Sequence, residues 1–351
     1  MPWPIDLRRL LREERAAIAV TVAFMLTALV GLTGAATDLG LLYTAHNQLQ
    51  NAADAAALAA ADTIITYDAS LYAQVDYPAA LATAQQISSA NQALGVNLNL
   101  LEPDFVVGKY DLATNQWITT GSSDNPDDIN AVQVTLRRDE VANTPVDTYF
   151  AGIVGYPQVG LTATALAFIG YAGSAPEGAV ALPIAVNAQA VLGDDDGPDC
   201  GEALVFHSEP HENAEWTTFF DWPCNDPNVR DYVCGCKSSP ELKVGDDINV
   251  INGNLSNHTF SALAQRFQEE GTDTDGDGLA DQWMVMLPVV ESGQCATKAH
   301  VVGFAHFIIT EVRTAPEKEV VGILQCGMVS PDSATGGEDF GTRAGHPKLV
   351  H

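Results

Sequence analysis

Residues Ala16–Ala36 read AAIAVTVAFMLTALVGLTGAA and contain no charged side chain. An α-helix rises about 1.5 Å per residue, so this run covers about 30 Å, which is the thickness of the hydrocarbon core of a bilayer. The run therefore predicts a single transmembrane span near the start of the chain.

The charges on either side of this span predict its orientation. Asp38 follows the span, and four arginines precede it: Arg8, Arg9, Arg12 and Arg15. Basic segments next to a span stay on the cytoplasmic side. We therefore expect residues 1–15 to form a basic cytoplasmic N-terminus and the bulk of the chain to lie outside the cytoplasm.

A cleavable signal peptide is the alternative interpretation, because Thr33–Ala36 offers the small residues that signal peptidase prefers. However, the apolar run is longer than a typical signal-peptide core of roughly 7 to 15 residues. The helical pattern also continues through LLYTAHNQLQNAADAAALAAADTII to Ile65. These features favour an uncleaved anchor that continues as one extended helix over residues 16–66.

The extension of this helix is unusually rich in small residues. Residues 51–61 contain eight alanines in eleven positions, and Ala53, Ala56 and Ala60 share one helical face. Within the span, Gly31 and Ala35 lie four residues apart, which permits close approach of a neighbouring helix. Helix packing at these five positions and simple filling of a lone anchor both remain open.

The stretch from Arg15 to Ala61 is similar to the TadE/TadG-like proteins of the tight-adherence (Tad, or Flp) pilus systems of bacteria. The resemblance rests on the arginine before the apolar run, the Asp-Leu-Gly at 38–40 and the alanine-rich tail. It implies an inner-membrane component, with its C-terminal bulk in the periplasm or at the cell surface. It also implies that other Tad pilus proteins, or copies of the same chain, meet the N-terminal helix.

True pilins carry a glycine before the mature N-terminus and a glutamate at mature position five. Glu13 and Glu14 precede the apolar run here with no glycine upstream. This departure favours an anchored TadG-like component over a processed pilin. A self-assembling extracellular fibre subunit remains the alternative.

The rest of the chain predicts an α+β fold in two parts. Over 67–171 we expect a pilin-like module, with a helix at 71–94 followed by strands near 105–110, 116–118, 131–136 and 159–169. The sequence AGSAPEG at 172–178 predicts a joint. Over 172–351 we expect a β-rich extracytoplasmic domain with a helix at 256–270 and, from Ser330, a mobile tail.

All six cysteines lie in this second part, at Cys200, Cys224, Cys234, Cys236, Cys295 and Cys326. An even number outside the cytoplasm predicts disulfides, whose pairing the sequence leaves open. A zinc site at Cys234 and Cys236, completed by Cys224 or by His207 and His211, is the alternative. Structural zinc sites commonly use C-x2-C pairs, so the spacing favours disulfides.

The sharpest local motif is DTDGDGLAD at residues 273–281. It places carboxylates at positions 1, 3, 5 and 9 of a calcium loop, a turn glycine at position 6 and a backbone carbonyl at position 7. Met284 stands at position 12, where an EF-hand carries glutamate, so the loop resembles thrombospondin type 3 and dockerin-like repeats. An ordinary acidic turn is the alternative to a structural Ca²⁺ bound by Asp273, Asp275, Asp277, Leu279 and Asp281.

The composition of the chain, and the sequence motifs that it lacks, reduce the number of possible function classes. The 351 residues include 45 acidic and 16 basic side chains, a formal net charge of -29, which opposes nucleic-acid binding. The chain has no Gly-x-Ser-x-Gly, no His-Glu-x-x-His and no Asp-x-Ser-x-Ser adhesion motif. We therefore expect a structural protein rather than an enzyme. An anchored hydrolase built on His207, His211 and Glu212 is the less favoured alternative.

Overall fold

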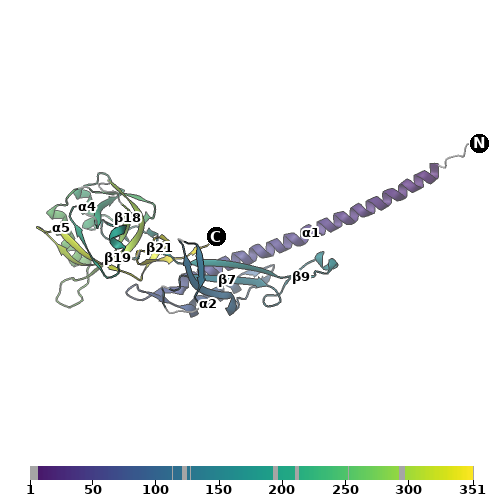
Figure 1. The fold of residues 1–351 in the computed structure, drawn as a ribbon, viewed down its shortest axis with the longest axis horizontal. Helices are drawn as coiled ribbons and strands as arrows, with labels where there is room; N and C mark the ends of the chain where they lie inside the picture. Colours follow the sequence, from purple (N-terminus) through teal and green to yellow (C-terminus); the bar gives the residue numbers. More distant parts are fainter. Residues whose placement is uncertain are drawn as a thin grey trace, which may run out of the picture. The chain divides into compact units, whose positions relative to one another are not determined.

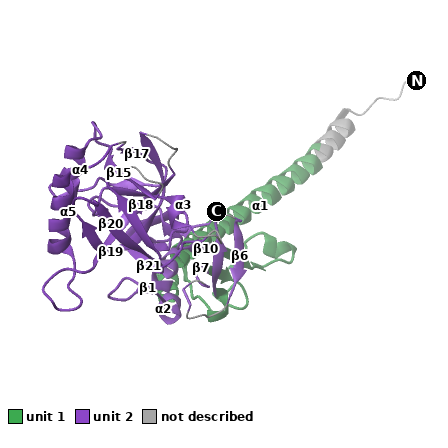
Figure 2. Cartoon of the chain, turned by 60° about the vertical axis from the view of Figure 1, so that its left-hand side comes forward, with its two compact units in different colours: residues 1–57, 82–105, 133–165 green, residues 58–81, 106–132, 166–351 purple. Residues whose placement is uncertain are grey.

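The computed structural model describes residues 7–112, 114–120, 125–126, 128–192, 197–209, 213–251, 253–291 and 297–350, with backbone alone at 7–17. It confirms the predicted fold class. A long N-terminal helix leads into a mixed α+β chain that is dominated by antiparallel strands. The described chain divides into two compact units: residues 1–57, 82–105 and 133–165 form unit 1, and residues 58–81, 106–132 and 166–351 form unit 2 (Figure 2). The predicted domain boundaries follow one another along the chain, whereas these units interleave.

Helix α1 runs without a break from Leu7 to Ile64 (Figure 1). Its 58 residues correspond to a length of about 87 Å. Every side chain from Ile18 to Thr33 is exposed, whereas a buried stripe begins at Gly34. The stripe follows the helical repeat of three and four residues and includes Gly34, Asp38, Ala45, Leu49, Ala52, Ala53, Ala56, Ala57, Ala60, Ala61 and Ile64. The helix thus has an exposed apolar half and a half that packs within the chain.

The second helix is shorter than predicted. α2 covers Tyr77–Ser89, and its first turn is fixed by Asp76, whose Oδ1 accepts the N–H of Ala79 at 2.9 Å. Residues 71–76 instead belong to a hairpin between β1 (Ile65–Tyr67) and β2 (Ala73–Val75). Leu71 has a φ of 65°, which a helix does not accept.

The predicted end of that helix is also different. Leu94 and Gly95 both have positive φ and form the turn between β3 (Gln92–Ala93) and β4 (Val96–Asn97). Two central residues with positive φ are typical of a type I′ hairpin turn. Gly95 therefore turns a hairpin rather than ending a helix.

A five-stranded sheet follows, in the order β23-β10-β7-β5-β6. The expected strands near 105, 116, 131 and 159 are confirmed, and β7 alternates buried and partly exposed residues as a strand with one buried face should. A short pair, β8 (Val146–Asp147) and β9 (Gln158–Val159), holds a loop that contains the 3₁₀ turn η2 (Ala151–Val154). The sheet strands are β5 (Phe105–Asp111), β6 (Gln116–Thr119), β7 (Ala131–Arg138), β10 (Leu161–Phe168) and β23 (Lys348–Leu349). A 3₁₀ turn, η1 (Glu102–Asp104), precedes β5.

Unit 2 is built around a seven-stranded sheet of order β14-β20-β19-β17-β15-β13-β18. Because β18 also pairs with β19, the strands β19, β17, β15, β13 and β18 form a closed ring. Only β13 and β18 run parallel among the pairs described in this sheet. The strands are β13 (Ile184–Asn187), β14 (Ala203–His207), β15 (Ala214–Phe219), β17 (Asp247–Val250), β18 (Trp283–Glu291), β19 (Lys298–Arg313) and β20 (Glu319–Gln325).

Three helices belong to this body, and the expected helix at 256–270 is confirmed as α5. Its N-cap Ser256 accepts the N–H of Thr259, and its buried Phe260 meets Trp216 of β15 edge to face at 5.6 Å. These rings lie in the main core, together with Phe206 and Phe307. The helices are α3 (Ala188–Val191), α4 (Asp226–Val233) and α5 (Asn257–Glu270).

The expected mobile tail from Ser330 is wrong. The segment forms β21 (Met328–Gly337) and β22 (Thr342–His346), which pair in parallel and close a small barrel with β11 (Tyr171–Ala172). A Cβ at Gly337 would lie 2.1 Å from the Ala172 carbonyl oxygen, so β21 and β11 can approach this closely only because residue 337 is glycine. The predicted joint at 172–178 contributes β12 (Ser174–Ala175), which pairs with β16 (Leu242–Lys243).

Candidate functional sites

The exposed half of α1 has the composition of a membrane span. In the described part of the chain, α1 is the one helix that is long and apolar enough to cross a bilayer, and its most apolar stretch is almost entirely exposed. Large apolar side chains such as Phe24, Met25 and Leu29 face outward all round the helix. A helix that is apolar on every side requires an apolar surrounding.

The five predicted helix-packing residues fall into two groups. Ala53, Ala56 and Ala60 are fully buried within the chain itself, so they contribute to its own packing. Gln50, on the same stretch of α1, donates to the Thr164 carbonyl of β10 at 3.2 Å. Gly31 and Ala35 are exposed and line an open apolar groove of about 650 Å³. Packing against a neighbouring helix at those two positions stays a prediction.

Asp38 performs a role that the sequence analysis did not assign. Its carboxylate is buried and accepts three backbone N–H groups from the loop between β8 and β9. Tyr149 donates to Oδ1 at 2.9 Å, while Phe150 and Ala151 donate to Oδ2 at 2.9 and 2.7 Å. Three charge-assisted hydrogen bonds fasten the loop to α1. One signal was available: Asp38 is the single formal charge between Arg15 and Asp54.

The predicted calcium loop lies on the surface between α5 and β18. Asp273, Asp275 and Asp281 each offer a carboxylate oxygen, and these oxygens all lie within 4.8 Å of one another. Asp277 stands outside this group, and its Oδ1 accepts the N–H of Leu279 at 2.8 Å. The structure therefore brings together three of the four predicted carboxylates.

Hydrogen bonds within the loop already shape it. Asp273 accepts the N–H groups of Gly278 and Gly276 at 2.8 and 2.6 Å, and these bonds lower the pKa of its carboxyl group. Asp281 accepts the hydroxyl of Thr274 at 2.5 Å. Both glycines have positive φ, which the tight winding of the loop requires.

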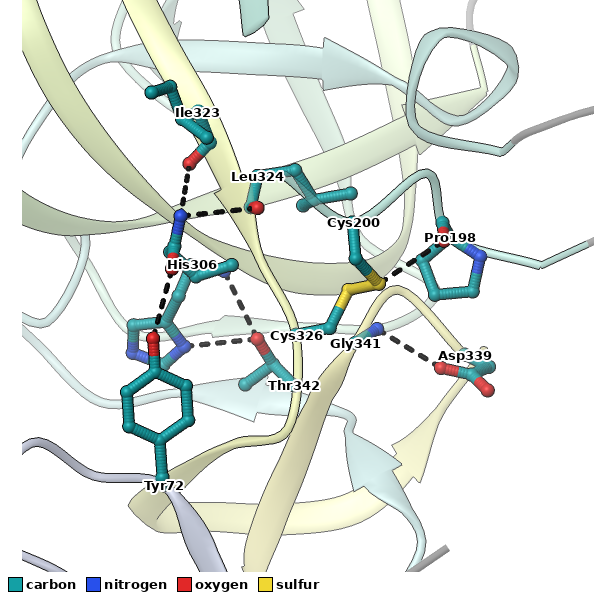
Figure 3. The surroundings of a disulfide bond; sticks show 11 residues. Tyr72, Pro198, Cys200, His306, Ile323, Leu324, Cys326, Asp339, Gly341 and Thr342 are labelled. Carbon is teal, nitrogen blue, oxygen red and sulfur yellow. Dashed lines mark hydrogen bonds between the residues drawn. A yellow bond between two sulfur atoms is a disulfide. The ribbon is translucent and has the colours of Figure 1, made fainter. Parts of the chain in front are cut away.

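Among the cysteines that the structure describes, two pairs form disulfides. Cys200 and Cys326 join segments 126 residues apart, with their Cα atoms separated by 5.6 Å (Figure 3). Cys234 and Cys236 form the second pair. Their thiols are therefore engaged with each other, which opposes the zinc alternative. Cys224 is partly buried, has no disulfide partner among the described residues, and has a thiol whose pKa is raised by burial. Cys295 lies outside the described residues.

A buried histidine stands beside the Cys200–Cys326 disulfide (Figure 3). The Nδ1 atom of His306 lies 3.0 Å from the Thr342 hydroxyl oxygen, and the same oxygen accepts the His306 backbone N–H at 3.1 Å. Burial lowers the pKa of His306 to about 4. The imidazole is therefore neutral at pH 7, and it joins β19 to β22.

Of the three candidate hydrolase residues, the structure describes His207 alone, and it does not lie in a catalytic arrangement among the described residues. His207 Nδ1 lies 3.3 Å from Glu319 Oε1 at the end of the β14–β20 pair, while His211 and Glu212 lie outside the described residues. Within the described chain, the grouping of potential metal ligands is the aspartate set of the 273–281 loop, which contains no histidine or cysteine.

Together, the fold and these features define a chain whose apolar anchor is continuous with an α+β body. Comparison with known protein families shows which proteins this chain is similar to. Residues 16–63 match the family described as putative Flp pilus-assembly TadE/G-like, and residues 59–167 match the family described as putative Tad-like Flp pilus-assembly. Residues 16–167 thus match Tad-type Flp pilus-assembly families, as the resemblance implied. No curated protein and no solved structure matches the chain.

Proposed function

We propose that this protein is a non-enzymatic structural component of a Tad (Flp)-type pilus system, held in the bacterial inner membrane by residues 16–36 of α1. The observation that carries the proposal is the change of surface along one unbroken helix. Its apolar side chains are exposed from Ile18 to Thr33, and from Gly34 a buried stripe ties the helix to the folded body. The match of residues 16–167 to Tad pilus-assembly families supports the assembly role.

The proposed topology places the N-terminus in the cytoplasm and the acidic body outside it. Four arginines before the span support this direction, because basic residues are retained on the cytoplasmic side. The two disulfides of the body support an oxidising compartment. The proposed partners are other Tad pilus proteins or further copies of the chain, which meet it through the N-terminal helix, and the family matches support this choice of partner.

Fractionation of cells tests this proposal against a fibre subunit. An anchored component remains in inner-membrane vesicles, and a protease added to spheroplasts digests its body while residues 1–15 stay protected. A fibre subunit instead appears in surface material released by shearing. Recovery of the chain mainly in that sheared fraction would contradict the anchor.

We further propose that the 273–281 loop binds a structural Ca²⁺ ion through Asp273, Asp275, Asp277, the Leu279 carbonyl and Asp281. Three neighbouring carboxylates support it, because like charges at such distances repel one another unless a cation lies between them. Asp277 must turn toward the other three for the full set to bind.

Thermal unfolding of the whole protein in detergent tests the calcium proposal. Added Ca²⁺ should raise Tm relative to a chelator, because an ion that binds the folded state stabilises it. Asp273→Asn should abolish most of this difference. Asp332→Asn changes an exposed aspartate outside the loop and should leave it intact. Equal Tm values of the unmodified protein with Ca²⁺ and with chelator would overturn the proposal.

A further inference from the structure

The loop between β8 and β9, residues 148–157, exposes an unusual number of large apolar side chains. Ile153, Val154, Tyr149 and Tyr156 are 80%, 73%, 72% and 68% exposed. No charged residue occurs from Thr148 to Gly170. Several large exposed apolar groups on one short loop indicate a surface that is covered in use.

The neighbouring stretch of α1 is uncharged as well. Its single formal charge between Arg15 and Asp54 is Asp38, which is 4% exposed and occupied by the loop's own N–H groups. The chain as a whole carries 45 acidic residues. Helix and loop therefore share one face without an exposed formal charge in an otherwise strongly acidic protein.

This face reaches the level of the membrane span. The groove between helix and loop is lined by Thr27, Val30 and Gly31 on α1 and by Ile153 and Val154 on the loop. Thr27 precedes Asp38 by 11 residues, which is about 16 Å along a helix. If residues 16–36 span the bilayer, the loop lies beside the half of the span that is remote from the arginines.

The loop backbone is suited to an apolar environment. Buried or lipid-exposed N–H groups need partners, and unpaired ones are costly in hydrocarbon. Most N–H groups here have partners within unit 1: the loop carbonyls accept those of Thr148, Ile153, Gly155 and Tyr156, and Asp38 accepts those of Tyr149, Phe150 and Ala151. Pro157 has no N–H to satisfy.

We propose that the loop 148–157 is a second membrane contact, which inserts into the non-cytoplasmic leaflet beside α1. Ile153 and Val154 contact lipid acyl chains, one of which occupies the groove along Gly31 and Ala35. Tyr149 and Tyr156 lie at headgroup level, where tyrosine is favoured. Asp38 fixes the loop to the helix, so the loop is held at a defined depth beside the span. This inference rests on the proposed anchor.

Lipid is favoured over a partner protein because the face is continuous with the exposed apolar surface of the span. A bilayer that surrounds residues 18–33 also reaches the loop, because the two line the same groove. The helix of a second copy in that groove is the competing occupant, and the experiment below separates the two.

Site-specific photocrosslinking of the whole protein, reconstituted in phosphatidylethanolamine and phosphatidylglycerol vesicles, tests the inference. The photoreactive amino acid p-benzoyl-phenylalanine replaces Ile153 in the loop, Leu29 in the span or Val141 as the control. Val141 is 68% exposed and belongs to the turn after β7. Arg138 at the end of β7 donates to the Ala93 carbonyl, and the next residue, Leu94, donates its N–H to Gln48 of α1. The turn therefore lies near Gln48, which is about 15 Å farther along α1 than Asp38 on the side away from the span.

Mass spectrometry of the adducts gives the result. We expect phospholipid adducts at Leu29 and Ile153, at a yield roughly tenfold above that at Val141, because the control lies beyond the lipid headgroups. If Leu29 forms lipid adducts but Ile153 forms protein adducts or no adducts, the loop contact is overturned and the anchor stays intact. Equal lipid labelling at Ile153 and Val141 would also overturn it. Absence of lipid adducts at Leu29 would overturn the anchor itself.

Discussion

At the scale of single residues, Asp38 shows what sequence reasoning could not reach. Its isolation in an uncharged stretch is visible in the sequence, but its partners are 111 to 113 residues away. Nothing local predicts that a loop without charges returns to this carboxylate. The same holds for His306 of β19 and Thr342 of β22, whose strands belong to different sheets that only the fold of unit 2 brings together.

The Asp38 contact predicts a local change in dynamics. Asp38→Ala removes the acceptor of three N–H groups, so amide hydrogen exchange of Tyr149, Phe150 and Ala151 should accelerate by roughly tenfold or more, as expected when charged hydrogen bonds are lost. Asp54→Ala, on the same helix, should leave these amides unchanged, since its described hydrogen bond is to Gln50. Unchanged exchange in Asp38→Ala would show that the loop is held by other contacts.

His306 predicts a pH dependence of stability. Its folded pKa is about 4, whereas an unfolded histidine titrates near 6.5, so between these values the unfolded chain binds a proton that the folded chain excludes. This contribution to the free energy of unfolding is constant above pH 6.5 and falls as the pH drops toward 4. Between pH 7 and pH 5 the loss is about 2 kcal/mol.

Urea unfolding at these two pH values measures the effect. The difference between pH 7 and pH 5 should shrink in His306→Gln by about the same 2 kcal/mol. His258 is exposed on α5, and His258→Gln should retain the dependence of the unmodified protein. An unaltered dependence in His306→Gln would mean that the buried imidazole does not titrate as its burial implies.

At the scale of elements, helices and strands with a regular apolar period were predicted correctly, whereas irregular segments were not. The α1 helix, strands β5, β6, β7 and β10 of the five-stranded sheet, and α5 follow from apolar spacing and, for α5, a serine N-cap. The helix expected at 71–94 was too long because Leu71 and Leu94 adopt positive φ, which side-chain hydrophobicity does not encode. The tail from Ser330 was wrongly predicted to be mobile because a glycine-rich composition is typical of loops, whereas Gly337 here allows two strands to approach closely.

The buried stripe of α1 predicts the response to larger side chains. Ala56 is fully buried and Ala55, its neighbour, is exposed. Ala56→Leu should therefore destabilise the folded body by about 1 to 3 kcal/mol, because the packed interior has no room for the added atoms. Ala55→Leu should change stability by less than about 0.5 kcal/mol, as surface substitutions do.

Denaturant unfolding in detergent compares the two variants under the same conditions. Equal effects of Ala55→Leu and Ala56→Leu would show that the alanine-rich segment does not pack within the chain in the way described. It would then be available to a neighbouring helix, as the resemblance to the Tad family first suggested.

At the scale of the whole molecule, the even number of cysteines indicated an oxidising environment but not the pairing. The Cys200–Cys326 bond joins positions 126 residues apart, and that proximity depends on the completed fold of unit 2. The proximity of three carboxylates in the 273–281 loop could be predicted because their spacing is local. Residues 168–351 lie beyond both family matches, so the body of unit 2 was accessible only through its physical pattern.

The proposed arrangement gives the molecule two parts with opposite requirements. The span needs lipid around it, while the acidic, disulfide-bonded body needs water and an oxidising compartment. A single continuous helix joins them, so the proposed function depends on that helix remaining part of the mature protein.

Intact mass measurement of the protein isolated from its native cells tests this point most directly. The account predicts a mature chain that retains residues 16–36 and remains in the inner membrane after alkaline carbonate extraction, which removes peripheral proteins. A mature chain that begins near Thr37 and is recovered in the soluble fraction would contradict it.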